Sequence, residues 1–144
     1  MKSSEILIKK IAEYEGMRLE SYLCPAKKWT IGFGHTKGVK PGQKITEAQA
    51  WLLLRGDLLP CEQYVNGLGV CKTQGNFDAL VDFAYNAGQG KLASSTLLRK
   101  IRAGASESEI RNEFSRWVYS NGVKLNGLVK RRQWEADRFF EKEA

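Results

Sequence analysis

The chain has 144 residues, enough for one compact domain, and its content of 42% hydrophobic and 27% charged residues argues against disorder. Its net charge of +7 predicts an acidic partner, such as nucleic acid, an anionic membrane surface or an anionic polymer, unless the charge serves only solubility.

The first 14 residues lack the apolar core and small-residue cleavage site of an export signal, and no stretch reaches transmembrane length. We therefore expect a protein made in the cytoplasm, without stable membrane insertion. Three Cys residues cannot all pair within one chain, so reduced thiols are expected there, although Cys61 and Cys71 could pair in an oxidising compartment. A single His and the absence of a CxxC motif predict no zinc site, and no cofactor is implied.

The chain begins with a predicted helix. Ser3 or Ser4 can cap it, and Gly16 can end it in a left-handed conformation, which places Glu15 at or near its last position. The stretch 19–45 then mixes aromatic and β-branched residues with Gly and Pro, a pattern typical of a small antiparallel hairpin or meander.

The rest of the sequence has a helical pattern. Thr46 and Gln49 form a capping box for a helix over 47–68, in which Pro60 predicts a kink or break. Further helices are predicted over 74–87, 96–103, 108–120 and 127–143. The order of elements predicts an α+β fold in one domain, with a β-containing part over about 16–45 and a helical part formed by 1–15 and 46–144.

Three polar side chains could converge where the first helix ends beside the hairpin. Glu15 lies at the negative end of the helix dipole, which disfavours the ionised carboxylate and suits a general acid, although a lone Glu there could simply be solvated. Cys24 lies in the predicted loop and Thr30 in the predicted strand. These three residues predict a concave catalytic site.

The run that follows Thr30 contains two glycines and the chain's only His. Gly32 and Gly34 would leave a strand face open to an extended ligand. His35 could be catalytic, but we favour a structural role in which it hydrogen-bonds the strand to a helix.

The residues Glu15-Gly16, Leu19 and Tyr22, with the run TIGFGH at 30–35, resemble the signature of phage-type lysozymes, the endolysins of glycoside hydrolase family 24. The resemblance continues in order through FAYNAG (83–88), SSTLLRKI (94–101), FSRW (114–117) and GLVKRR (127–132), and so covers nearly the whole chain. It implies a lysozyme-like fold, with a small β-containing lobe joined by a long helix to a helical lobe. It also implies hydrolysis of the β-1,4 bond between N-acetylmuramic acid and N-acetylglucosamine in bacterial peptidoglycan.

The resemblance assigns roles to single residues. Glu15 matches the acid that protonates the leaving oxygen, Thr30 matches a Thr that helps to place the attacking water, and His35 matches a structural His. Cys24 stands where the family usually has Asp. In the helical part, three residues fall where the lobe would line the cleft or pair with the catalytic Glu: Asn86, Trp117, and one of Arg131 or Arg132.

A Cys at the Asp position leaves the mechanism open. A free thiol has a pKa of about 8.5 and is mostly neutral at pH 7, although Lys27 and Lys28 lie close enough in sequence to favour the thiolate. Cys24 could act as base or nucleophile, could be a weak substitute, or could mark a protein that only binds the wall. We predict an active enzyme in which Cys24 supports the attack by water, because Glu15 and Thr30 are present.

Three alternatives stay in view. A lytic transglycosylase cleaves the same bond with one acid/base group, so it tolerates loss of the Asp. A nucleic-acid-binding module would use Lys130, Arg131 and Arg132, but the basic residues are spread along the chain and no nucleic-acid motif appears. A wall-binding protein without activity is the third. We expect a monomer that binds peptidoglycan glycan strands and no nucleic acid, and that reaches the wall of the lysing host through a separate membrane pore.

Overall fold

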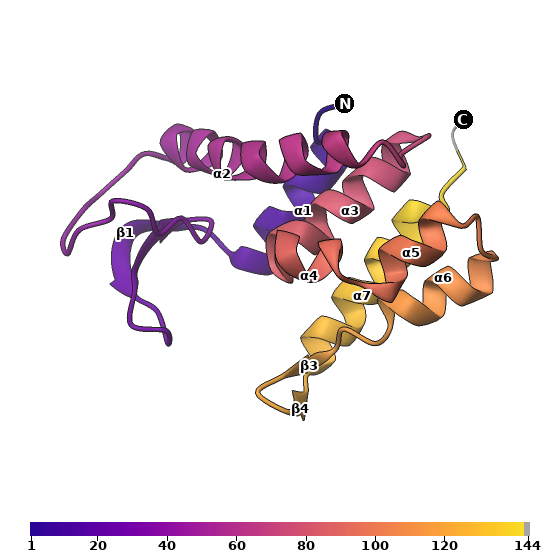
Figure 1. Cartoon of the computed structure of the whole chain (residues 1–144). Coiled ribbons are helices and arrows are strands. Elements are labelled where there is room, and N and C mark those ends of the chain that lie inside the picture. The colour runs from indigo at the N-terminus through magenta and orange to yellow at the C-terminus, as the bar shows by residue number, and fades with distance from the viewer. Residues whose placement is uncertain (143–144) are drawn as a thin grey trace. The chain divides into compact units, whose positions relative to one another are not determined.

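The computed structural model describes residues 1–142, and within them seven helices and two two-stranded antiparallel sheets follow one another as Figure 1 shows. This mixture confirms the predicted α+β class. The chain divides into two compact units, an N-terminal unit (Ser4–Pro60) and a C-terminal unit that starts at Cys61 and includes Met1–Ser3.

Helix α1 (Glu5–Glu15) opens the N-terminal unit. The Ser4 hydroxyl accepts a hydrogen bond from the Leu7 N–H at 3.1 Å, which satisfies one of the free donors of the first turn. The helix ends at Gly16, whose φ of 71° suits a residue without a side chain. Glu15 is therefore the last helical residue, as predicted.

Strands β1 (Arg18–Leu23) and β2 (Trp29–Gly32) form the first sheet, and Leu23 pairs with Trp29 across the connecting loop 24–28. The segment after β2 returns to β1, where Ile45 N–H donates to the Leu19 carbonyl at 2.9 Å. These bonds confirm the predicted hairpin or meander.

Helix α2 (Glu47–Leu68) begins with the predicted capping box: Thr46 N–H donates to Gln49 Oε1 at 2.8 Å and Gln49 N–H donates to Thr46 Oγ1 at 3.2 Å. The break expected at Pro60 does not occur, because the helix continues past it for two turns. The carbonyl that loses its donor is that of Gly56, four residues earlier and exposed, so water can replace the missing hydrogen bond.

The C-terminal unit contains α3 (Gln74–Asn86), α4 (Gln89–Ala93), α5 (Thr96–Arg102), α6 (Glu107–Phe114) and α7 (Asn126–Phe139). Helix α3 is buried along most of its length, and α7 lies beside it (Figure 1). Gly75 is required there, because a Cβ at this position would overlap the Arg138 carbonyl oxygen of α7. The short helix α4 was not predicted.

A second hairpin replaces part of a predicted helix. The helix expected over 108–120 ends at Phe114, and the chain forms β3 (Tyr119–Ser120) and β4 (Val123–Lys124). Asn121 and Gly122 connect them with φ of 51° and 77°, the two positive values that a type I′ hairpin turn requires. Asn-Gly is a strong hairpin signal, and interpreting it only as a helix stop was wrong. The last helix is also shorter than predicted, and its expected end at Glu143 lies outside the described residues.

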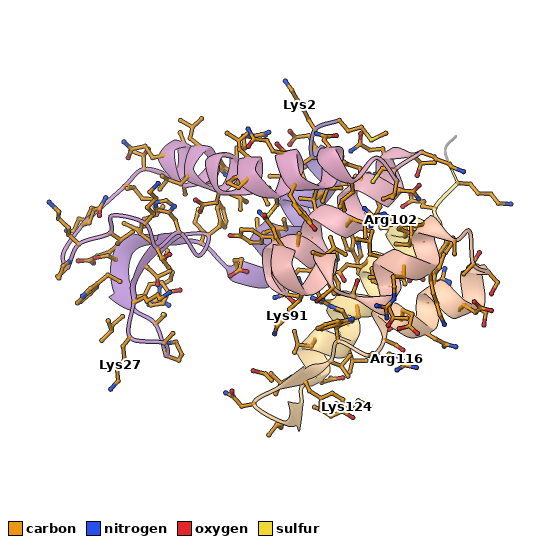
Figure 2. All side chains as sticks on the ribbon, in the orientation of Figure 1. Lys2, Lys27, Lys91, Arg102, Arg116 and Lys124 are labelled. Carbon is orange, nitrogen blue, oxygen red and sulfur yellow. The ribbon has the colours of Figure 1, made fainter. Side chains whose placement is uncertain are left out.

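None of the helices within residues 1–142 is long and apolar enough to cross a bilayer. The basic side chains of the C-terminal unit are distributed over several elements: Lys91, Arg102, Arg116 and Lys124 project from α4, α5, the turn after α6 and β4 (Figure 2).

Candidate functional site

Glu15 and Gly34 are neighbours within the N-terminal unit. The Glu15 side chain is half-buried at the end of α1, and Gly34 lies in the loop after β2. A Cβ at Gly34 would stand 2.9 Å from Glu15 Oε2 and 3.4 Å from its Cδ. The missing side chain of Gly34 therefore leaves the space that the Glu15 carboxyl group occupies.

Gly34→Ala should disturb this carboxyl group, whereas Gly38→Ala provides a matched control. Both glycines have positive φ, 82° and 71°, so each Ala should cost about 1–2 kcal/mol of stability. At Gly38 no atom lies within 4 Å of the added Cβ. We expect similar losses of stability in urea unfolding, but a lower lysis rate only for Gly34→Ala. Equal lysis by both variants would mean that the position of the Glu15 carboxyl group does not matter.

Cys24 and Thr30 meet at the other end of the hairpin. Cys24 begins the loop 24–28, which closes through Cys24 N–H to Lys28 O at 3.0 Å and Lys27 N–H to Cys24 O at 2.8 Å. The Lys28 backbone N–H, the Thr30 hydroxyl and the Ala26 backbone N–H donate to the sulfur and lower the pKa of the Cys24 thiol. The loop therefore favours the thiolate by hydrogen bonding.

The Thr30 hydroxyl has a single proton to share between two acceptors. It donates to the Lys28 carbonyl oxygen at 3.0 Å, and the residue is only 4% exposed. When Cys24 is a thiol, its S–H can donate to Thr30; when it is a thiolate, the Thr30 hydroxyl must turn to the sulfur. The protonation state of Cys24 and the direction of the Thr30 hydroxyl are thus linked.

The other two cysteines lie in the C-terminal unit and differ from Cys24 in reactivity. All three are free thiols. Burial raises the pKa of Cys61, and burial raises that of Cys71 to about 11. The thiolate, which is the nucleophilic form, therefore forms more readily at Cys24 than at Cys61 or Cys71.

His35 and Gly32 are placed by contacts with α2. The His35 ring lies 2.9 Å from Asp57 Oδ1 through Nδ1 and 2.9 Å from the Lys37 carbonyl oxygen through Nε2, so both ring nitrogens face acceptors. Gly32 is buried, with Ala50 and Ile45 at 3.5 Å where its side chain would stand. Protein atoms thus occupy the space that the sequence interpretation left open to a ligand at Gly32.

Three of the residues expected in the helical part line one cavity of the C-terminal unit. Asn86, Trp117 and Arg132 surround a space of about 220 Å³, together with Lys91 and Tyr119 among others. The Trp117 ring stands edge-on against Phe83 at a centroid distance of 5.4 Å. This cavity combines aromatic faces with hydrogen-bond donors, a lining that suits a polar, ring-shaped ligand.

The resemblance assigned one site position to either Arg131 or Arg132, and the structure gives these two arginines different surroundings. Arg131 is buried and donates two hydrogen bonds to Asp82, from Nε to Oδ2 at 3.0 Å and from Nη2 to Oδ1 at 2.7 Å. Arg132 is the one that lines the cavity, and its Nη2 donates to Asn86 Oδ1.

Sequence reasoning missed the buried carboxyl pair beside these arginines. Burial raises the pKa of Glu135 well above its usual range, helped by Asp82, which accepts its proton and repels its charge. Burial opposes ionisation of Asp82 too, but hydrogen bonds from Glu135 and Arg131 hold its pKa below the usual range. Asp82 and Glu135 lie on different predicted helices, and each has apolar neighbours in the sequence. Nothing in the local sequence therefore indicates that the two carboxyl groups meet.

The predicted site residues thus fall in two groups. The N-terminal unit carries Glu15, Cys24, Thr30, Gly32 and His35, and the C-terminal unit carries Asn86, Trp117, Arg131 and Arg132. Within residues 1–142 no cluster of three or more His, Cys, Asp or Glu side chains is arranged to hold a metal ion.

The sequence and the structure of this chain are both similar to those of phage endolysins. The endolysin of Bacillus phage B103 is 44% identical over 151 aligned positions, which cover all of this chain and 56% of that protein, so the chain spans little more than half of that relative. Among solved structures, the endolysin from Escherichia coli O157:H7 phage FAHEc1 matches with a TM-score of 0.89 and 35% identity, covering 98% of this chain and 94% of the other.

The muramidase domain of SpmX from Asticaccaulis excentricus matches with a TM-score of 0.88 and 34% identity, over 98% of this chain and 99% of that one. The family model for phage lysozyme matches residues 12–135, which include every predicted site residue. The chain therefore belongs to the phage lysozyme family.

Proposed function

We propose that this chain is a muramidase that hydrolyses the β-1,4 bond between N-acetylmuramic acid and N-acetylglucosamine in bacterial peptidoglycan, and that this hydrolysis lyses the host cell. Membership of the phage lysozyme family and the likeness to phage endolysins support the proposal. Glu15, Cys24 and Thr30 carry the chemistry.

The reaction is a single displacement at the anomeric carbon. Glu15 gives its proton to the leaving glycosidic oxygen as that bond breaks. A water molecule attacks the opposite face, and its proton passes to the Cys24 thiolate. Cys24 becomes a thiol and Glu15 a carboxylate, and exchange of one proton through solvent restores both.

The observation that carries this mechanism is the hydrogen-bonded pair of Cys24 and Thr30. Donors from the loop backbone lower the pKa of Cys24, which gives the thiol part of the anionic character of the Asp it replaces. Thr30 accepts from the thiol or donates to the thiolate, so it can orient a water beside the sulfur in either state.

Mass spectrometry of digested peptidoglycan tests the reaction class. Hydrolysis leaves muramic acid with a free reducing end, which is the expected product. An anhydro-muramic product would instead identify a lytic transglycosylase, in which the sugar's own hydroxyl closes the ring. Glycan that stays intact after prolonged incubation would show that the protein binds the wall without cleaving it.

The role of Cys24 gives a separate expected result. Iodoacetamide at pH 7 should modify Cys24 first, because the pKa values of Cys61 and Cys71 are raised. Peptide mapping should show that the loss of lysis follows modification of Cys24, and Cys24→Ser should lower the rate by about 100-fold or more. Cys24→Asp should be active and resist the reagent. Full-rate lysis by both the alkylated protein and Cys24→Ser would exclude a role in catalysis.

The cellular setting is part of the same proposal. We propose that the chain acts as a monomer on glycan strands, binds no nucleic acid, and reaches the wall from the cytoplasm through a separate membrane pore. Its charge of +7 suits an anionic wall. A salt-dependent gel shift of DNA together with absent wall lysis would reverse this assignment.

A further inference from the structure

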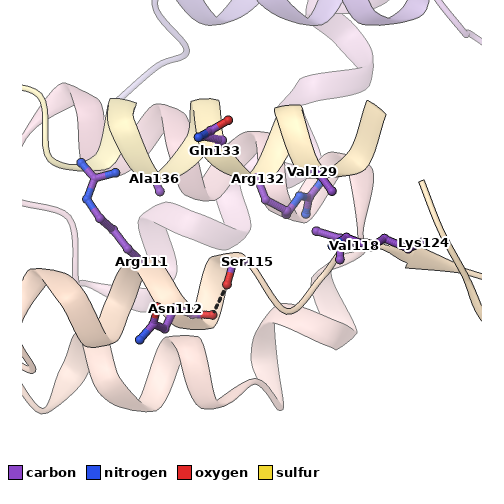
Figure 3. Close-up of a pocket in the computed structure, with 9 residues that line it drawn as sticks. All are labelled: Arg111, Asn112, Ser115, Val118, Lys124, Val129, Arg132, Gln133 and Ala136. Carbon is purple, nitrogen blue, oxygen red and sulfur yellow. Dashed lines mark hydrogen bonds between the residues drawn. The ribbon is translucent and has the colours of Figure 1, made fainter. Parts of the chain in front are cut away.

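A second cavity of the C-terminal unit has no part in the proposed reaction. It lies between α6, α7 and the β3–β4 hairpin and has a volume of about 430 Å³, within the usual range for small-molecule sites (Figure 3). Val118, Val129 and Ala136 supply apolar surface, and Asn112 and Gln133 supply amides. The cavity suits a ligand with both an apolar and a hydrogen-bonding part.

Arg132 lines this cavity with a guanidinium group that is only partly satisfied, although it also lies over the Phe83 ring at 5.0 Å from the ring centroid. The side chain is 1% exposed, its Nη2 donates to Asn86, and its Nε lies 3.2 Å from Glu135 Oε1. Nη1 is buried and has no hydrogen-bond partner within residues 1–142. A buried donor without an acceptor costs about 1–3 kcal/mol, and more when it is charged, so an anion here would be stabilising.

Two arginines and two carboxyl groups are buried together around Arg132. Arg131 and Arg132 contribute two positive charges, and Asp82, which pairs with Arg131, contributes one negative charge. Burial and the contact with Asp82 raise the pKa of Glu135, which favours its neutral form 3.2 Å from Arg132 Nε. The neutral form leaves Arg132 without a carboxylate charge, in addition to the Nη1 that is unpartnered among the described residues.

Arg111 and Lys124, the other two cations that line the cavity, differ in their ion pairs. Arg111 already pairs with two carboxylates, because its Nε contacts Glu107 Oε2 at 2.8 Å and its Nη1 contacts Asp137 Oδ1 at 2.7 Å. Lys124 of β4 has no ion-pair partner in the part of the chain that the structure describes. Figure 3 shows Arg132 reaching from α7 toward Val129 and Val118, on the side where Lys124 lies. Arg132 and Lys124 are thus the two cations at this cavity that could accept an anion.

We propose that this cavity binds a small organic carboxylate of about amino-acid or dipeptide size, with its carboxylate between Arg132 and Lys124 and its apolar substituent on Val118, Val129 and Ala136. A bare phosphate would satisfy the cations but would leave the apolar surface in water. An uncharged ligand would bring no negative charge to Arg132 and Lys124. Glu15, Cys24 and Thr30 are not among the residues that line this cavity, so binding can be tested without any assay of wall hydrolysis.

Titration of the ¹⁵N-labelled protein with N-acetylvaline tests the proposal through the amide resonances of Ser115, Val118, Lys124 and Val129. We expect saturable shifts at these residues. N-acetylvalinamide, which lacks the carboxylate, and inorganic phosphate should both bind at least about tenfold more weakly. Equal binding of the acid and its amide would overturn the proposal, and so would tighter binding of phosphate or an absence of shifts.

Variants distinguish a specific role of the cavity cations in binding from a general effect of the protein's positive charge. Lys124→Gln should weaken binding about three- to tenfold, whereas Lys130→Gln, which removes an equal charge from the exposed face of α7, should leave it unchanged. Glu135→Gln should also leave the affinity unchanged, because the raised pKa of Glu135 favours the neutral form that Gln imitates. Tenfold tighter binding by Glu135→Gln would show that Glu135 is ionised and would overturn the charge balance, as would equal effects of the two Lys variants.

Discussion

Glu15→Gln is expected to lower the rate of wall lysis by about 100- to 10,000-fold, the contribution of a general acid in the transition state. The amide keeps the size of the carboxyl group and its place beside Gly34, but it cannot give a proton to the leaving oxygen. Turbidity loss of a peptidoglycan suspension at fixed protein concentration measures the effect.

Two controls make this result specific. Far-UV circular dichroism and the urea midpoint should match the parent protein, since Glu15 is half-buried at a helix end and Gln there leaves the backbone bonds in place. Glu13→Gln, an exposed acid two residues earlier on α1, should lyse at the parent rate. Near-parental lysis by Glu15→Gln would falsify the glycosidase assignment, whatever Cys24 does.

Arg131→Met should destabilise the C-terminal unit by about 3–5 kcal/mol, because it leaves the buried Asp82 carboxylate without its bidentate partner. Arg111→Met is the matched control. Arg111 also contacts two carboxylates, but those of Glu107 and Asp137 are more than half exposed, so its loss should cost no more than about 1 kcal/mol. Urea unfolding at pH 7 measures the free energy of unfolding of both variants. Equal losses of stability would contradict the argument that the buried ion pair matters more than the exposed ones.

The destabilisation by Arg131→Met should depend on pH. The pKa of Asp82 is lowered in the folded protein, so its stabilising effect is present above the unfolded pKa of about 3.9 and is lost as the pH falls through the folded value. The gap between parent and variant should therefore be widest near neutral pH and narrow below about pH 4. The raised pKa of Glu135 acts in the opposite direction, stabilising the fold at low pH and less as the pH rises. A gap that widens below pH 4 would contradict the role of Asp82.

Local signals in the sequence were enough to place most elements. Ser4 and Gly16 bound α1, and Thr46 with Gln49 opens α2, because caps act within one helical turn. Where a local signal had two meanings, the prediction failed: Asn121-Gly122 served as a hairpin turn and not as a helix end. The predicted break at Pro60 was wrong for a different reason. The effect of a proline inside a helix depends on whether the carbonyl that loses its donor, here that of Gly56, can reach water.

The sequence by itself determined the α+β class, the family and the candidates Glu15, Cys24 and Thr30, because these follow from periodicity, caps and a motif contained within 21 consecutive residues of the N-terminal region (15–35). Only the tertiary structure showed that the Cys24 sulfur accepts hydrogen bonds from its own loop, that Gly34 makes room for the Glu15 carboxyl group, and that Arg131 pairs with Asp82 while Arg132 does not. These properties depend on burial and on partners distant in sequence, which set pKa values and charge balance and leave no trace in local pattern.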